Sequence, residues 1–154
     1  MNSLNIDPIT IEEEELWPKD PLVSLEKPFI DARGNIQPLV DCMMKSAVLI
    51  ESKAGSLRAN HYHKTDWHYC YVITGSIDYY HRTFGSDIKP ELLLVKQGNM
   101  VFTPPLVEHC MKFPVDTTFL TLSRNSRDQA TYEADVVRVN LVDVGNSISW
   151  SPNE

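Results

Sequence analysis

The segment GSLRANHYHKTDWHYCYVITG, residues 55–75, holds three histidines between two glycines. His61 and His63 are two residues apart, and alternate residues of a β-strand face the same side, so a strand here presents both imidazoles together. His68 stands on what the sequence predicts to be the next strand. A fourth histidine, His109, comes from far down the chain. Imidazoles that are separate in sequence but joined by strand geometry indicate a metal site.

The ligand chemistry of this cluster narrows the choice of metal. Neutral imidazole nitrogen suits Zn, Ni, Fe and Cu, whereas Mg and Ca need oxygen ligands. We therefore expect His61, His63, His68 and His109 to hold one divalent transition metal. The alternative is a metal-free pocket in which the same histidines act as acids, bases or hydrogen-bond partners.

The composition is that of one ordinary globular domain. The chain has 154 residues, 42% hydrophobic and 23% charged, and one core is expected at this length. A formal charge of −7 argues against binding to nucleic acid. No stretch reaches the ~18 apolar residues of a membrane span, and the first residues lack the features of a signal peptide. We expect a cytoplasmic protein without membrane or nucleic-acid partners.

The cysteines give no sign of a disulfide framework or a sulfur-rich zinc site. Cys42, Cys70 and Cys110 are odd in number and have no CxxC spacing. We expect them to be reduced, and we expect Cys70, which shares a strand face with His68, to line the pocket as a small apolar wall.

Outward from the histidine motif the chain consists of short β-rich runs separated by turns. We expect strands at residues 36–41, 46–51, 57–63, 67–74, 76–83, 91–95, 100–103, 107–113 and 117–123. A short helix over 128–135 and a strand over 136–144 follow. Many short strands in one domain predict a sandwich or barrel, so the expected fold class is all-β.

The two ends of the chain differ from this β-rich middle. The first thirty residues contain four prolines and the acidic run 12–15, and they have no sustained strand or helix period. We expect an N-terminal arm at 1–30, a barrel domain at 31–145 and a tail at 146–154. Trp17 in the arm is expected to pack on the barrel or on a second subunit.

Two motifs can be written from these residues: G(x5)HxH(x4)H(x6)G from Gly55 to Gly75, and G(x5)PxLxxH from Gly98 to His109. Together they resemble the cupin superfamily, which implies a double-stranded β-helix (jelly-roll) barrel. In cupins the first motif normally has two His and a Glu, and the second has PxG before its His. Here His68 replaces the Glu, which keeps a ligand but removes one negative charge, and Leu106 replaces the Gly.

Two further segments resemble the sugar 3,4-ketoisomerases and the related dTDP-keto-sugar 3,5-epimerases. They are FxDxRG at 29–34 and RxxHxHK at 58–64. The resemblance implies a homodimeric enzyme of polysaccharide or deoxysugar synthesis that acts on a nucleotide-linked keto sugar, by proton transfer next to a carbonyl. The ketoisomerases need no metal and generally have Gln at the position of His68. That one residue therefore separates a metal site from a bare histidine site.

Isomerisation of a keto sugar needs a base, stabilisation of the enediolate oxygen and an acid. A histidine that titrates near pH 7 can serve as base and acid, so His61 and His63 are the catalytic candidates in a metal-free site. If a metal takes the clustered imidazoles, another group must move the proton. Tyr79 and His81, two residues apart on the strand after Gly75, are then the best candidates.

Neighbouring residues have smaller expected roles. Strand alternation points Arg58 away from His61, so we expect a structural or interface charge. Asp66, in the loop at the mouth, is expected to reach substrate, and Glu108 is expected to face away from the site although it adjoins His109.

Two other functions remain open. The first is a metal-dependent cupin that oxygenates or cleaves a small organic acid or diketone. The second is a non-catalytic module that binds a metal or a sugar.

Overall fold

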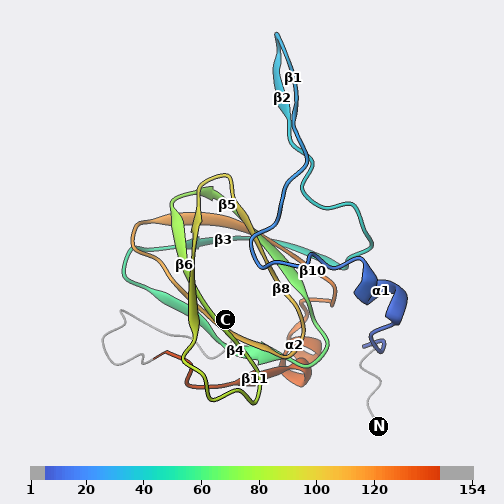
Figure 1. Cartoon of the computed structure of the whole chain (residues 1–154), viewed down its shortest axis with the longest axis vertical. Helices are drawn as coiled ribbons and strands as arrows, with labels where there is room; N and C mark the ends of the chain where they lie inside the picture. The colour runs from blue at the N-terminus through green and yellow to red at the C-terminus, as the bar shows by residue number, and fades with distance from the viewer. Residues whose placement is uncertain (1–5, 143–154) are drawn as a thin grey trace.

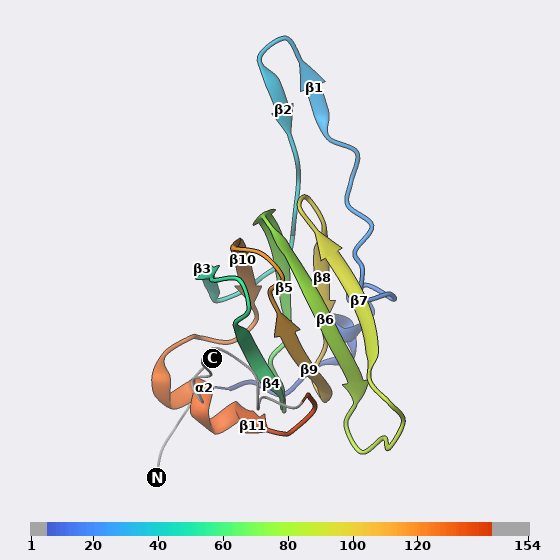
Figure 2. The ribbon, with the colours of Figure 1, turned by 90° about the vertical axis from the view of Figure 1, so that its left-hand side faces the viewer.

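The computed structural model describes residues 6–142, and within them the chain forms two facing antiparallel sheets (Figures 1 and 2). The four-stranded sheet contains, in order, β3 (Ser46–Ser52), β10 (Thr117–Ser123), β5 (His68–Thr74) and β8 (Met100–Thr103). The five-stranded sheet contains, in order, β11 (Val136–Arg138), β4 (Leu57–His63), β9 (Val107–Lys112), β6 (Ser76–Thr83) and β7 (Glu91–Lys96). This is a jelly-roll barrel, and the predicted all-β class is confirmed.

The predicted strands of the barrel agree with β3 to β10 to within one residue at each end. The strand predicted over 36–41 is wrong. Instead β1 (Phe29–Asp31) and β2 (Gly34–Ile36) form a hairpin across the boundary predicted between the arm and the barrel, and Pro38, which lacks an N–H, follows it. The hairpin turn is closed by Asp31, whose Oδ1 accepts the backbone N–H of Arg33 at 2.9 Å.

Two short helices lie outside the sheets. The helix α1 (Ile11–Glu15) contains the acidic run 12–15, and Thr10 and Glu13 form a capping box at its start. The helix α2 (Gln129–Asp135) confirms the helix predicted over 128–135, and Asp128 caps its start by accepting the Thr131 N–H. The strand predicted to follow it is shorter than expected, since β11 ends at Arg138 and residues 143–144 lie outside the described part.

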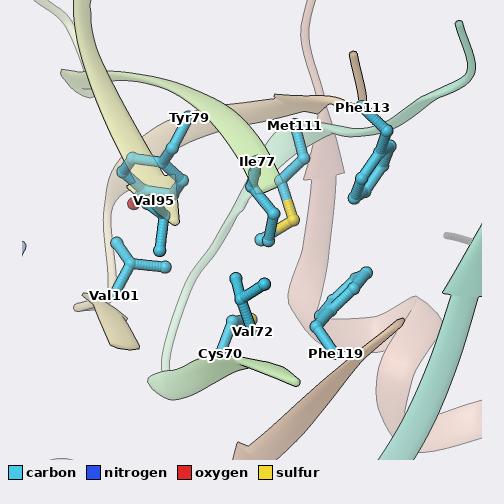
Figure 3. Close-up of a cluster of buried hydrophobic side chains, with 9 residues drawn as sticks. All are labelled: Cys70, Val72, Ile77, Tyr79, Val95, Val101, Met111, Phe113 and Phe119. Carbon is cyan, nitrogen blue, oxygen red and sulfur yellow. The ribbon is translucent and has the colours of Figure 1, made fainter. Parts of the chain in front are cut away.

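An apolar core fills one end of the space between the sheets (Figure 3). It consists of Cys70, Val72, Ile77, Tyr79, Val95, Val101, Met111, Phe113 and Phe119. Along β9 the inward side chains run from His109 through Met111, with Phe113 just beyond the strand. Along β5 they run from His68 through Cys70 to Val72. The histidines therefore occupy the other end of the same interior.

The N-terminal arm packs on the outer face of the four-stranded sheet, as expected for Trp17. The Trp17 ring lies 6.1 Å from that of Phe102. Glu13 of α1 accepts hydrogen bonds from Trp67 Nε1 and Arg124 Nε, so a half-buried carboxylate fastens the arm to the barrel.

The β1–β2 hairpin projects away from the barrel in both views (Figures 1 and 2). Three of its apolar side chains are largely exposed: Phe29, Ile30 and Ile36 are 60%, 69% and 65% accessible. None of the helices within residues 6–142 has the length and apolar character to cross a membrane.

Candidate active site

A β-bulge precedes His61 on β4 and sets the direction of the residues around it. Ala59 pairs with Cys110 and His61 with His109, so Asn60 is an extra residue in the ladder. Ala59 and Asn60 have φ of 70° and 67°, in the left-handed region that non-glycine residues rarely adopt.

The Asn60 side chain holds this bulge in place. Its Oδ1 accepts the backbone N–H groups of Leu141 and Val142 at 3.0 and 3.1 Å, and its Nδ2 donates to the Val142 carbonyl at 3.0 Å. The segment after β11 therefore secures the strand that carries two of the four histidines.

The bulge corrects the expectation for Arg58. Because of the extra residue, Arg58 pairs with Met111 and faces inward with His61, so the prediction that it points away from the site is wrong. Its guanidinium donates from Nε to Ser52 Oγ at 2.7 Å and from Nη2 to the Glu51 carbonyl at 3.0 Å. These contacts place a cation in the wall of the histidine pocket.

The four predicted ligands meet in one buried pocket: His61 and His63 from β4, His68 from β5 and His109 from β9. The ring centroids of their neighbouring pairs lie 4.7 to 5.8 Å apart. An ion ~2.1 Å from each nitrogen holds its imidazole rings roughly 5 Å apart. The observed spacing is therefore suitable for one transition-metal ion.

The donor atoms fall into two groups that share His63. Those of His61, His63 and His109 lie within 4.8 Å of one another, and so do those of His63, Asp66 and His68. Asp66, expected only to reach substrate from a loop, is thus a buried member of the cluster.

Burial keeps the imidazoles of His61, His68 and His109 uncharged. Desolvation, reinforced by the neighbouring imidazoles, holds the pKa of His61 and of His68 well below the ordinary value. The pKa of His109 falls to about 3, again mainly through burial. At neutral pH these side chains offer lone pairs, which suits metal ligation, and they hold no proton to donate as imidazolium.

Two of the rings are oriented by partners outside the pocket. His109 Nδ1 donates a hydrogen bond to the Val107 carbonyl at 2.9 Å, which leaves the lone pair of Nε2 available to bind a metal. His63 Nδ1 lies 3.4 Å from Asp135 Oδ2, a close polar contact without good hydrogen-bond alignment. Burial raises the pKa of Asp135, but its contacts with His63 and Thr65 outweigh this and leave the pKa below its ordinary value.

The pocket is small and covered by α2. Its volume is about 50 Å³, enough for an ion and a water molecule. Tyr132 of α2 lies over it, with its ring 6.3 Å from that of His61 and 5.7 Å from that of His63. The Arg127 guanidinium stacks on Tyr132 at 4.4 Å. Neither Tyr132 nor Asp135 carries a sequence signal that links it to the histidine motifs.

Tyr79 and His81 face inward, which a catalytic role for either would require. The Tyr79 ring lies between the rings of His81 and His109. Its centroid is 5.2 Å from His81 and 6.3 Å from His109. Tyr79 Oη is hydrogen-bonded to Thr103 Oγ1 at 2.6 Å, and burial raises the tyrosine pKa further above its ordinary value. His81, whose pKa burial lowers, lines a second cavity of about 220 Å³ beside Pro18. Catalytic roles for this pair stay a prediction.

The smaller predictions have clear outcomes. Cys70 lines the pocket as expected, and Glu108 faces away from it, paired with Arg82 at 2.9 Å. Leu106 has φ of 64°, which explains why glycine is favoured at this place in the second motif. A larger cavity, about 600 Å³, lies between the arm and Trp67, on the opposite side of β5 from His68.

Comparison with known proteins gives a likeness of structure. No family model matches the sequence, and no curated protein matches it. The sugar 3,4-ketoisomerase QdtA from Thermoanaerobacterium thermosaccharolyticum, solved with TDP, superposes with a TM-score of 0.63 at 18% identity. The match covers 77% of this chain and 87% of that one.

Two further solved structures are similar. The dTDP-6-deoxy-D-glucose-3,5-epimerase RmlC from Legionella pneumophila, solved with dTDP-4-keto-L-rhamnose, gives a TM-score of 0.64 at 14% identity over 82% of this chain and 80% of that one. The capsular polysaccharide assembling protein CapF from Staphylococcus aureus gives 0.56 at 18% identity over 77% of this chain and 34% of that one. The chain therefore has the RmlC-like cupin fold.

Proposed function

We propose that this protein is a metal-binding cupin enzyme that isomerises or epimerises a nucleotide-linked keto sugar. The observation that carries the metal is the convergence of four buried imidazoles, from three strands, whose donor atoms form two overlapping groups that share His63. Zinc, nickel, iron and copper all accept this donor set.

Similarity in fold to enzymes that act on nucleotide-linked sugars supports the sugar substrate. Structures similar to this chain include a ketoisomerase bound to TDP and an epimerase bound to a dTDP-keto-sugar. The FxDxRG and RxxHxHK segments resemble the same enzymes.

Such a site divides the work between the metal and the chain. When bound, the ion supplies Lewis-acid stabilisation of an enediolate oxygen. Val107 and Asp135 orient His109 and His63, and Tyr132 shields the pocket from water. Arg58 and Arg127 in the pocket wall favour negative charge there.

A second candidate function is favoured by the size of the pocket. A volume of about 50 Å³ does not hold a hexose ring, so a sugar needs α2 and Tyr132 to move aside. A small organic acid or diketone needs a smaller movement. A metal-dependent oxygenase or lyase of such a compound is therefore the alternative.

Elemental analysis of protein purified without chelator or added metal tests the proposal. We expect close to one transition-metal ion per chain, and its absence after supplementation with Zn, Ni, Fe and Cu would contradict the metal site. A thermal shift with dTDP separates the two functions, because a small-acid oxygenase has no reason to bind a nucleotide. Oxygen uptake by the iron- or copper-loaded protein would favour the oxygenase.

We also propose that the enzyme is a cytoplasmic homodimer. Cys42, Cys70 and Cys110 are free thiols, which suits a reducing compartment. The projecting hairpin supports the dimer: an isolated two-stranded hairpin is marginally stable in water, and its exposed apolar side chains need a partner surface. A second copy of the chain is the simplest partner.

A further inference from the structure

Asp66 is a buried carboxylate beside the histidines. It lies in the loop between β4 and β5, is only 8% exposed and lines the pocket. One of its oxygens, Oδ1, accepts the backbone N–H of Asn125 at 2.9 Å. Asp66 and His68 are two residues apart, and their donor atoms lie within 4.8 Å of each other and of His63.

The loop that carries Asp66 is held firmly. Asp135 accepts the backbone N–H groups of Thr65 and Asp66 at 2.9 and 3.0 Å, and the Thr65 hydroxyl at 2.6 Å. The Asn125 side chain also donates to Thr65 Oγ1 at 3.0 Å. The Asp66 carboxylate is therefore positioned before any ligand arrives.

The charge of Asp66 has no cationic side chain paired with it among residues 6–142. The hydrogen bond from Asn125 offsets only part of the cost of burying this charge, and a paired cation or a bound metal would offset more of it. An ion held by imidazoles alone also keeps its full positive charge. Binding of the ion by the Asp66 carboxylate would offset both the buried negative charge and the positive charge of the ion.

We propose that Asp66 is a ligand of the metal ion, in addition to the histidines. The proposal rests on the metal site of the proposed function and adds a carboxylate to it. The cupin pattern takes its carboxylate from the position of His68, so here the loop two residues earlier supplies the charge that the exchange of Glu for His removed. With Asp66 bound, the site carries one positive charge fewer.

The variant Asp66→Asn tests this, because an amide oxygen still accepts the Asn125 N–H while the charge is lost. Glu108→Gln is the matched control: Glu108 is 7% exposed and adjoins His109, but it faces away from the pocket. Zinc affinity is measured by competition with a chelator, and coordination by the visible absorption of the Co²⁺-loaded protein.

We expect Asp66→Asn to raise the zinc Kd more than about 100-fold, beyond the 10- to 100-fold typical of residues that only orient a ligand. We also expect altered Co²⁺ absorption bands and a higher thermal midpoint of the metal-free variant, since an unpaired buried charge is gone. Glu108→Gln should leave the zinc Kd and the Co²⁺ bands unchanged.

Two outcomes would overturn the assignment, and they are distinguishable. Unchanged affinity and Co²⁺ bands in Asp66→Asn, with a wild-type protein that binds metal, would reject Asp66 alone. A wild-type protein that binds no metal would reject the metal function as well. If Asp66→Asn fails to fold, Asp66→Glu replaces it: shifted Co²⁺ bands support ligation, and unshifted bands reject it.

Discussion

His68 is the side chain on which the proposed metal site depends most. It lies at the start of β5, is buried, and its ring is 5.2 Å from that of His109 and 5.7 Å from that of His63. Gln in its place would offer a neutral amide, which is a poor ligand for zinc or nickel. The identity of this one residue therefore bears directly on metal affinity.

We expect His68→Gln to weaken zinc binding more than about 100-fold, because loss of a ligand exceeds the 10- to 100-fold cost of losing an orienting partner. Isothermal titration against zinc measures it. The control is Tyr69→Phe, next in the strand and on its outer face. Full metal occupancy in His68→Gln would show that the cluster is not the metal site.

Gly75 allows a second test by a single substitution. Its φ is 93°, and an added Cβ would lie 2.4 Å from Thr117 Oγ1 and 2.5 Å from the Asp116 carbonyl. We expect Gly75→Ala to lower the free energy of unfolding by about 3 kcal/mol, from left-handed strain plus overpacking. Gly85→Ala, with φ of 85° and open space, should cost about 1 kcal/mol. Equal losses in urea denaturation would contradict the steric argument.

The sequence contains enough to predict the four histidines but not their surroundings. Strand alternation relates His61 to His63, and the motif spacing relates both to His109. The same rule gave the wrong face for Arg58, because a bulge changes the face that a residue occupies. Ala59 and Asn60 form this bulge, and neither is a glycine, so the sequence does not indicate it. Asp135 was not predicted as part of the site, because it lies in a helical segment 67 residues after His68 and no sequence pattern indicates which strand that segment contacts.

The β1–β2 hairpin has apolar side chains that a single copy of the chain leaves exposed. Its turn is well formed, yet Phe29, Ile30 and Ile36 remain exposed. The strand predicted at 36–41 includes Pro38, which has no N–H to donate to a neighbouring strand, and the observed pairing lies upstream, around the Asp31–Gly34 turn. The strands of the barrel were easier, since each is bounded by turn residues and packs one face on the core.

We expect the triple variant Phe29→Ser, Ile30→Ser and Ile36→Ser to shift the protein from dimer to monomer without unfolding the barrel. The reason is that these side chains contribute exposed apolar area and no part of the barrel core. Sedimentation equilibrium gives the oligomeric state and circular dichroism gives the fold. A variant that remains dimeric would place the interface elsewhere, for instance at the exposed Leu49 of β3.

The neutral histidines are expected to make the metal-free protein as a whole sensitive to acid. Because the native pKa values of His61, His68 and His109 are lowered, the unfolded chain takes up protons below about pH 6.5 that the native state refuses. Each such group costs about 1.4 kcal/mol per pH unit. Asp66 has the opposite sign, since burial raises its pKa to about 6 and the native state protonates first.

The three histidines and Asp66 have opposite effects, which leaves a net difference of about two protons between the unfolded and native states. The free energy of unfolding of the metal-free protein is therefore expected to fall by about 3 kcal/mol per pH unit below pH 6. Urea denaturation at pH 7, 6 and 5 measures the slope. The variant His68→Gln removes one of the three histidines and should show a shallower slope. A free energy that stays constant from pH 7 to pH 5 would mean that the imidazoles are solvated and titrate normally.

The bulge at Asn60 also affects how this chain is aligned with others. A strand without the extra residue, aligned without a gap through His61 and His63, would match Arg58 to a residue on the opposite side of the sheet. Equivalent inward side chains would then look unrelated, and an outward one would be taken for part of the pocket. Placing a single gap at Asn60 restores the correspondence, and substitutions at Arg58 are best interpreted only after that gap is made.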